Sequence, residues 1–218
     1  MTQASGGEAP LPEAAHVRAI RADLPALPAP ALALLFKAHT HHAWDGRPVS
    51  VDTLRRLVAL AFGGPTAFNQ QPLRVLFVTS PEAKARLAPA LSRANRDKTQ
   101  AAPVTAILCH DLAFHHHLPR LWPQADVRPY FDGKPEAARE SAFRNATLQA
   151  GYFLMAARAL GLDCGPMSGF DPAAVNAAFF ADEPRHRVNF LCSVGYGDPT
   201  SIFDRSPRPD FTRFNRIA

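Results

Sequence analysis

The chain has 218 residues, of which 47 % are hydrophobic, and this size and composition suit one globular domain with a single core. Its formal charge is +5, but no block of five basic residues and no nucleic-acid-binding motif accompanies it. No apolar run approaches the roughly 18–20 residues of a membrane span, and no signal-peptide pattern opens the chain. We therefore expect a cytoplasmic protein with no nucleic-acid partner and no membrane partner.

The N-terminal part of the chain differs from the rest. Residues 1–30 are rich in alanine, proline and glycine, a composition typical of a loosely held or partly disordered arm. Residues 31–218 are expected to form the folded domain. Apolar residues at helical spacing predict helices over 31–43 and 51–62, with Ser50 placed to cap the second.

The middle of the chain alternates between helical and strand patterns. Short apolar runs predict buried strands over 73–79 and 104–109. A proline at the first turn marks a helix over 81–91. Residues 95–99 form a polar stretch and residues 111–135 show no firm pattern, so neither segment is assigned a structure.

The longest helix is expected over 136–160, closed by Gly161. Its second half is apolar on nearly every face, and such a helix is buried on all sides in a large core or at a subunit interface. Because 218 residues leave limited room for a large core, the pattern predicts an obligate homodimer. A short helix from Asp171–Pro172 and a strand over 188–194 follow, and this order of elements predicts a mixed α+β architecture.

Residues 63–72, which connect a predicted helix to a predicted strand, are the most informative stretch of the chain. Thr66, Asn69, Gln70 and Gln71 place hydrogen-bonding groups between a helix and a strand, where loops commonly carry function. A polar turn with no further role explains the same residues about equally well.

A glycine-rich segment, residues 161–170, follows the long helix. Its three glycines and one proline allow the backbone to lie close to a flat ligand and to present N–H groups. It lacks the G-x-G-x-x-G spacing of a dinucleotide-binding loop. A helix C-cap with a turn accounts for Gly161 but leaves Gly165 and Gly169 unexplained.

Histidines gather in two places. On the first predicted helix, His39 and His42 share a face with Thr40 adjacent, and residues 115–117 are three consecutive histidines. Neither group has the ligand spacing of a zinc site, so no metal is expected. His39, Thr40 and His42 suit an anion better, in line with the mild positive charge of the chain.

Two further sets of residues have simple interpretations. Arg208, between two prolines near the C-terminus, is either a solvated residue or a phosphate clamp. The three cysteines form no CxxC pair, which suits small buried residues in a reducing compartment; they are Cys109, Cys164 and Cys192.

Taken in order, these segments resemble the FMN-dependent nitroreductase family across roughly residues 31–212. Within it the chain is most similar to the malonic semialdehyde reductases, which form 3-hydroxypropanoate in pyrimidine degradation. Several separate matches in one order are more specific than any one of them. The matching segments are His39–Trp44 with Arg47–Val49, Gly64–Asn69 with Gln71–Pro72, Ala101–Val104, Phe143–Asn145 with Ala156–Asp171, Asn189–Cys192 with Gly195–Pro199, and Arg205–Arg208.

The resemblance implies a nitroreductase-like α+β fold: a central, mainly antiparallel sheet flanked by helices, in an intertwined homodimer with FMN bound between the subunits. His39, Thr40 and His42 would face the FMN phosphate and ribityl chain, and Arg208 would clamp the phosphate. The family usually has arginine where this chain has His39. The residues implied to contact the flavin are Thr66, Ala67, Asn69 and Gln71 from the other subunit, Asn95 and Lys98 at the ring edge, and Pro166, Met167, Ser168 and Gly169 along the ring.

The implied activity is a ping-pong reaction in which NADPH or NADH gives a hydride to the flavin and a second substrate then takes it. The flavin carries the hydride, and Lys98 and Ser168 are implied to assist. Malonic semialdehyde is the first candidate acceptor. Nitroaromatics, quinones or an enal are the alternative within the family, with Phe68 and Phe131 as lid or stacking residues. A non-enzymatic, His-rich metal-binding or flavin-storage protein is the alternative from another class.

Overall fold

A computed structural model describes residues 14–23 and 26–218. The described residues divide into two compact units, one ending at Lys37 and the other comprising residues 38–218. The first unit contains the helices α1 (Ala14–Asp23) and α2 (Ala29–Phe36). The division into an arm and a domain at residue 30 stays a prediction, and residues 1–13 and 24–25 of that arm lie outside the described residues.

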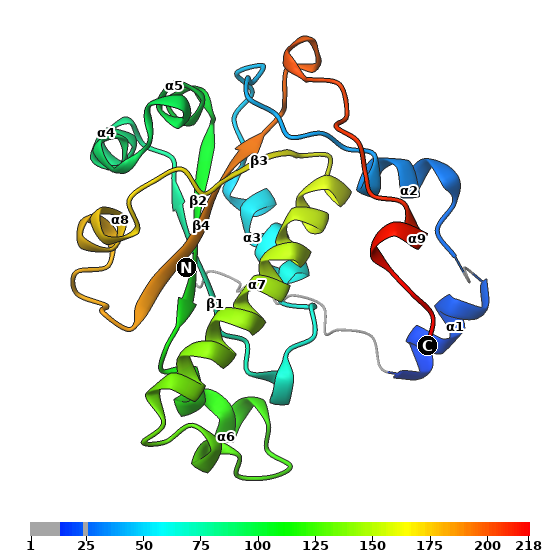
Figure 1. Cartoon of the computed structure of the whole chain (residues 1–218), viewed down its shortest axis with the longest axis vertical. Helices are drawn as coiled ribbons and strands as arrows, with labels where there is room; N and C mark the ends of the chain where they lie inside the picture. Colours follow the sequence, from blue (N-terminus) through cyan, green and yellow to red (C-terminus); the bar gives the residue numbers. More distant parts are fainter. Residues whose placement is uncertain (1–13, 24–25) are drawn as a thin grey trace, which may run out of the picture. The chain divides into compact units, whose positions relative to one another are not determined.

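The second unit is built on a four-stranded antiparallel sheet with the order β1-β2-β4-β3 (Figure 1). Every residue of β2 is buried, as the largely apolar run over 104–109 predicts for a strand covered on both faces. The predicted α+β fold with an antiparallel sheet is therefore confirmed. The strands are β1 (Leu73–Val78), β2 (Val104–Asp111), β3 (Asp163–Met167) and β4 (His186–Gly195).

Helices cover both faces of this sheet (Figure 1). Ala106 and Leu108 of β2 pack toward one layer, and Ile107 and Cys109 pack toward the other, because successive side chains of a strand point to opposite faces. The first layer consists of α3 (Val51–Ala61) and α7 (Pro135–Ala159), and the second includes α4 (Pro81–Leu87) and α8 (Pro172–Phe179).

The remaining helical elements are short. No helix among the described residues combines the length and apolarity needed to cross a membrane. These elements are η1 (Ala67–Asn69), η2 (Ala88–Ala90), α5 (Arg93–Ala101), η3 (Phe114–His117), α6 (Leu118–Leu121), η4 (Arg128–Tyr130), η5 (Pro199–Ser201) and α9 (Phe211–Phe214).

Several predicted helix ends are confirmed by their capping contacts. The Ser50 side chain accepts a hydrogen bond from the N–H of Thr53 at the start of α3. Asp171 accepts two backbone N–H groups at the start of α8. Gly161 has φ +76° just after α7, a conformation that glycine adopts at little cost.

One local expectation is wrong: the helix expected over 31–43 ends at Phe36, and the segment after it runs extended. Two segments without an assigned structure are regular. Residues 95–99 lie inside α5, which sequence periodicity misses because the positions it buries are polar. Residues 163–167 of the glycine-rich segment form β3. This strand lies at the edge of the sheet, where a proline that lacks an N–H is tolerated.

The long helix α7 is not buried on all sides within one chain. Ala146, Ala150 and Phe153 are fully buried, whereas Leu148 and Tyr152 on another face are 48 % and 45 % exposed. Within the single chain the sheet and α3 cover only one side of the helix, and the expected burial of the other side at a subunit interface stays a prediction.

Replacing Gly165 with alanine should destabilise the protein. The new Cβ would lie 2.7 Å from the backbone oxygen of His41, which cannot move without displacing the segment beside β3. Overpacking of this kind costs about 1–3 kcal/mol, measurable as a lower free energy of unfolding in urea. Ser193→Ala, opposite Gly165 in β4, is the matched control. Its buried hydroxyl has no hydrogen-bond partner among the described residues, so its loss should be nearly neutral. Equal losses in both variants would contradict the steric explanation.

Candidate functional site

The segment that carries His39, Thr40 and His42 is extended and lies along β3. The N–H of His41 donates to the carbonyl of Cys164 at 3.0 Å, and Thr40 bridges the same residue. Trp44 Nε1 donates to the backbone oxygen of Lys98 at 3.3 Å. These contacts hold the histidine segment between β3 and α5.

The same helix, α5, is tied to the end of the glycine-rich segment. Asn95 Nδ2 and the N–H of Ser92 both donate to the carbonyl of Gly169, at 2.8 and 2.9 Å. The Thr99 hydroxyl donates to the sulfur of Met167. A Cβ at position 169 would lie 2.6 Å from Asn95 Nδ2, so a larger residue there would require the Asn95 side chain to shift. Three of the predicted segments, 39–42, 95–98 and 166–169, are thus brought together.

The groups that meet here are mostly hydrogen-bond donors. Burial, and then the positive charge of Lys98, lower the pKa of His42. Partial burial also lowers the pKa of Lys98. No carboxylate of residues 14–23 or 26–218 forms an ion pair with Lys98. Because Lys98 disfavours the protonated form of His42, a dianion such as a phosphate bound beside both groups would favour their charged forms.

The C-terminal tail runs beside the histidine segment. His39 Nδ1 donates to the carbonyl of Phe203 at 3.0 Å, and Arg205 donates to the carbonyl of Ala38 at 3.1 Å. Arg208 lies three residues further along, is exposed, and donates to the carbonyl of its neighbour Ser206. In the described part of the chain no hydrogen bond or ion pair joins Arg208 to the histidine segment.

The polar loop over 63–72 is held elsewhere, against α7 and α6. The N–H of Ala67 donates to Asn145 Oδ1 at 2.9 Å, and Asn69 Nδ2 donates to the carbonyl of Leu121. Within the loop the N–H of Gln71 donates to Thr66 Oγ1. The polar loop therefore carries a second group of predicted residues, Thr66, Ala67, Asn69 and Gln71. Within one chain this group is separate from the group formed by segments 39–42, 95–98 and 166–169.

The backbone of this loop is strained. Phe68, Asn69 and Gln71 have φ values of +51°, +49° and +47°, a region that residues other than glycine adopt at a cost. Such conformations persist only where the surrounding structure imposes them, so the contacts that hold Gln71 matter most.

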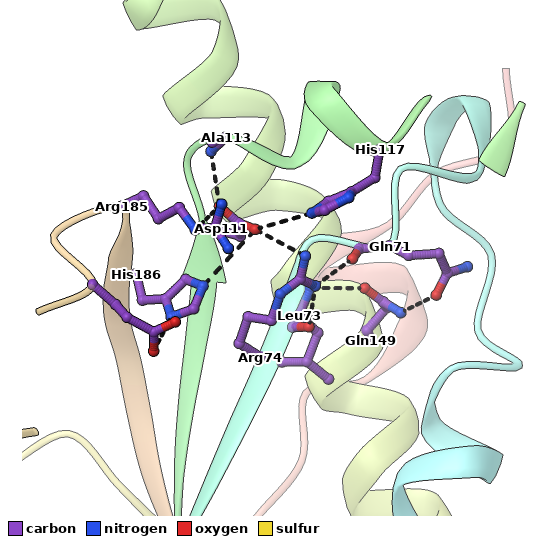
Figure 2. Close-up of polar contacts among 10 residues, drawn as sticks. Gln71, Leu73, Arg74, Asp111, Ala113, His117, Gln149, Arg185 and His186 are labelled. Atoms are coloured by element: carbon purple, nitrogen blue, oxygen red, sulfur yellow. Dashed lines mark hydrogen bonds and ion pairs between the residues drawn. The ribbon is translucent and has the colours of Figure 1, made fainter. Parts of the chain in front are cut away.

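A polar network fixes Gln71 on both sides (Figure 2). Its side-chain oxygen accepts from Gln149 Nε2 at 2.6 Å, and Gln149 Oε1 in turn accepts the N–H of Leu73. The backbone oxygen of Gln71 accepts from Arg74 Nη1, while Arg74 Nη2 donates to Asp111 at 2.8 Å. These hydrogen bonds join β1, α7 and the polar loop.

Asp111 anchors this network. Its carboxylate is fully buried, accepts the N–H of Ala113 at 2.9 Å and lies 3.8–3.9 Å from nitrogens of Arg185, His117 and His186 (Figure 2). Burying an unpaired carboxylate is costly, and these donors offset that cost.

Sequence reasoning missed Arg74, Asp111 and Gln149. A usable signal was present: Arg74 opens one apolar strand and Asp111 closes the next, so antiparallel pairing places the two charges side by side. Gln149 is, like Asn145, a polar residue on the buried face of α7, where helical periodicity alone predicts an apolar one.

Two other predictions are decided by burial. All three cysteines are buried, as expected, and burial raises the pKa of Cys109 to about 12, so this thiol is unreactive. Phe131 is also buried, packed edge-on against Phe114 with ring centres 4.9 Å apart. Its suggested role as a lid or stacking residue is wrong.

Asp111→Asn should weaken the whole network. The substitution keeps the shape of the side chain but removes the charge that Arg74 pairs with. The loss should be about 1.5–3 kcal/mol of unfolding free energy, the range for hydrogen bonds to a charged group. Hydrogen exchange at residues 66–71 should also become faster. Asp126→Asn breaks the exposed pair between Asp126 and Arg128, and should leave the free energy of unfolding almost unchanged. Unchanged exchange in the loop would contradict the anchoring role.

Comparisons with known proteins agree with this fold. A family model described as the nitroreductase family matches residues 36–196. A protein of Burkholderia lata, provisionally named NADH dehydrogenase/NAD(P)H nitroreductase, is 56 % identical over 184 residues, covering 84 % of this chain and 94 % of its own length. A protein of Stenotrophomonas maltophilia with the same kind of name is 54 % identical over 194 residues, covering 88 % and 98 %.

Solved structures also resemble the chain. A provisionally named nitroreductase of Exiguobacterium sibiricum, crystallised in complex with FMN, superimposes with a TM-score of 0.77 at 19 % identity. The superposition covers 88 % of this chain and 98 % of that one, and at this identity it supports the fold alone. The family model and the two relatives settle the membership: the chain belongs to the nitroreductase family.

Proposed function

We propose that the protein is an FMN-dependent oxidoreductase that takes a hydride from NADPH or NADH and passes it to a small-molecule acceptor. The observation that carries the proposal is the convergence of segments 39–42, 95–98 and 166–169 into one donor-rich group. The names of the relatives, which include NAD(P)H, and the FMN in the structural neighbour support it. The reduced, buried cysteines suit a cytoplasmic enzyme.

In this proposal, one end of the group holds the FMN phosphate. His39, Thr40 and His42 offer hydrogen-bond donors there. Arg208 would join them if the C-terminal tail shifted along the histidine segment by the length of a few residues. Charge-assisted hydrogen bonds hold a dianion more strongly than neutral ones. His39 stands where the family usually has arginine, so an imidazole replaces a guanidinium at this position.

The flavin ring would lie against α5 and the end of the glycine-rich segment. When bound, FMN supplies the ring that accepts and returns the hydride. Asn95 and Lys98 border that ring, with Lys98 supplying a partly desolvated positive charge. Ser168 and the backbone of Pro166, Met167 and Gly169 would lie along it.

A second subunit would complete the site with Thr66, Ala67, Asn69 and Gln71. Thr40, in the segment 39–42, forms a β-bridge with Cys164. Cys164 lies across the sheet from Val104, at the start of β2. Gln71 is tied through Arg74 to Asp111 at the end of β2. Seven steps along a strand span about 24 Å. This separation within one chain favours a cofactor shared by two subunits.

The exposed side of α7 is suited to pairing two chains. It borders an open groove of about 820 Å³, lined by Phe143, Leu148, Tyr152 and Met155 among others. Contiguous apolar surface of this kind usually marks an interaction site. We therefore propose a homodimer with this face of α7 in the interface.

Two acceptor classes remain candidates. Malonic semialdehyde rests on the similarity of the quoted segments to the reductases of that aldehyde. Planar nitro, quinone or enal compounds are favoured by one observation: Phe68, 38 % exposed, stacks on Tyr130 and meets the edge of Trp122 beside the polar loop. Aromatic faces of this kind suit a flat acceptor.

The purified protein should be yellow and should lose its flavin absorbance under anaerobic NADPH or NADH. A panel of acceptors, including malonic semialdehyde, a quinone, a nitroaromatic and an enal, then identifies the class that restores the absorbance. A colourless protein that binds no FMN would refute the proposed function. Metal in the fresh protein without flavin would favour the metal-binding alternative, and bound flavin that no nicotinamide cofactor reduces would favour flavin storage.

Lys98→Met should slow the reduction of the flavin by about 10²-fold, the lower end for the loss of one group that stabilises developing charge. FMN affinity should change much less, because the phosphate donors remain. Lys84→Met is the matched control, since Lys84 is another half-buried lysine with a pKa lowered by burial but lies on α4. Stopped-flow absorbance measures the rates, and an unchanged rate in Lys98→Met would rule out the role.

Leu148→Glu should convert the dimer to monomers and lower FMN affinity by at least about tenfold, since each site would lose the loop of the partner. The side chain is 48 % exposed, so the chain itself should still fold. Leu60→Glu, at a side chain of α3 that is 50 % exposed, is the control. Light scattering after size exclusion gives the mass, and a monomeric wild type would contradict the proposed interface.

A further inference from the structure

Two histidines and an aspartate meet in the segment between β2 and α7. His115 and His116 are adjacent on η3, and Asp132 follows η4, sixteen residues further along the chain. One potential ligand atom from each residue lies within 4.8 Å of the other two. His115 Nε2 is 3.4 Å from Asp132 Oδ1, and the two imidazole ring centres are 4.5 Å apart.

We propose that His115, His116 and Asp132 form a binding site for a divalent transition-metal ion, with Zn²⁺ as the reference ion. Two imidazoles and one carboxylate are a common ligand set for such ions, and water would fill the remaining positions. The site is distinct from the flavin site, and the proposal does not depend on the proposed function.

The geometry needs only small adjustments to accept an ion. Zinc–ligand bonds of about 2.0–2.2 Å place tetrahedral ligand atoms roughly 3.3 Å apart. His116 and Asp132 are exposed, so their side chains can rotate inward. His115 is held by the rings of Phe114 and Phe131 and supplies a fixed ligand.

The environment of His115 supports a chemical role. Its Nδ1 is buried and has no hydrogen-bond partner among the described residues, whereas Nε2 lies beside Asp132. An unpaired buried polar atom costs free energy, and an apolar side chain would fill the same place without that cost. A neutral imidazole that presents one nitrogen to the cluster is the form that binds a metal.

Neighbouring charges leave the carboxylate available. Arg128 pairs with Asp126, and Lys134 Nζ donates to the carbonyl of Pro129. Across the described ranges, the ion pair of Asp132 is with His115. That pair already brings a metal-ligating nitrogen and oxygen together.

A bound ion would brace the segment between β2 and α7, since it would join η3 to the turn after η4. This segment contacts the polar loop through Leu121, Trp122 and Tyr130. A bound metal ion would therefore stiffen the segment between β2 and α7 that contacts the polar loop.

The test uses the full-length protein as purified, without a polyhistidine tag. Competition with a chromophoric zinc chelator measures affinity and stoichiometry, and thermal unfolding with and without zinc measures stabilisation. We expect one zinc ion per chain and a melting temperature that rises with zinc. His116→Gln and Asp132→Asn should each lower zinc affinity by at least about tenfold, the lower end of the cost of losing even an outer-shell partner.

His117→Gln is the matched control, because His117 is the next residue on η3 but points toward Asp111. It should change zinc affinity less than about twofold, well below one ligand's contribution. The proposal fails if the wild type does not compete with the chelator, or if His117→Gln loses as much affinity as His116→Gln. It also fails if both site variants keep wild-type affinity. The fold of each variant is checked by its unfolding curve without zinc.

Discussion

The pairing of β2 with β1 and β4 sets the positions of the two groups of residues that are proposed to bind the cofactor. Because β2 is buried along its whole length, neither of its faces can carry polar chemistry, and such groups collect at its two ends. The histidine segment and α5 gather at the end that begins with Val104, and Asp111 anchors the polar loop at the other. The division of the proposed cofactor site between two subunits follows from this arrangement, since the strand is rigid and its length keeps the two groups apart.

The two ends use charge in opposite ways. At one end Asp111 is enclosed, and the donors around it offset its burial, so the charge serves to hold strained backbone in place. At the other end Lys98 is only half-buried and unpaired within the described residues, so its charge is available to a ligand.

Much of the fold could be predicted from the sequence because its determinants are local. The capped, periodic helix after Ser50 and the apolar runs of β2 and β4 are examples. The failures have non-local causes. Residues 38–44 are extended because the edge of β3 offers a carbonyl to His41, and β3 is obscured by Gly165 and Pro166. The donor segments were recognised by resemblance, but the Asp111 network and the approach of Asp132 to two histidines depend on contacts across the fold.

The edge of the sheet at β3 has a consequence for solubility. An unprotected edge strand can pair with strands of other molecules and start aggregation. Here the carbonyl of Cys164 is already used by His41, and Pro166 has no N–H to offer an incoming strand. The segment that brings donors to the proposed cofactor site thus also protects the sheet edge, so substitutions that loosen it would be expected to promote aggregation as well as impair binding.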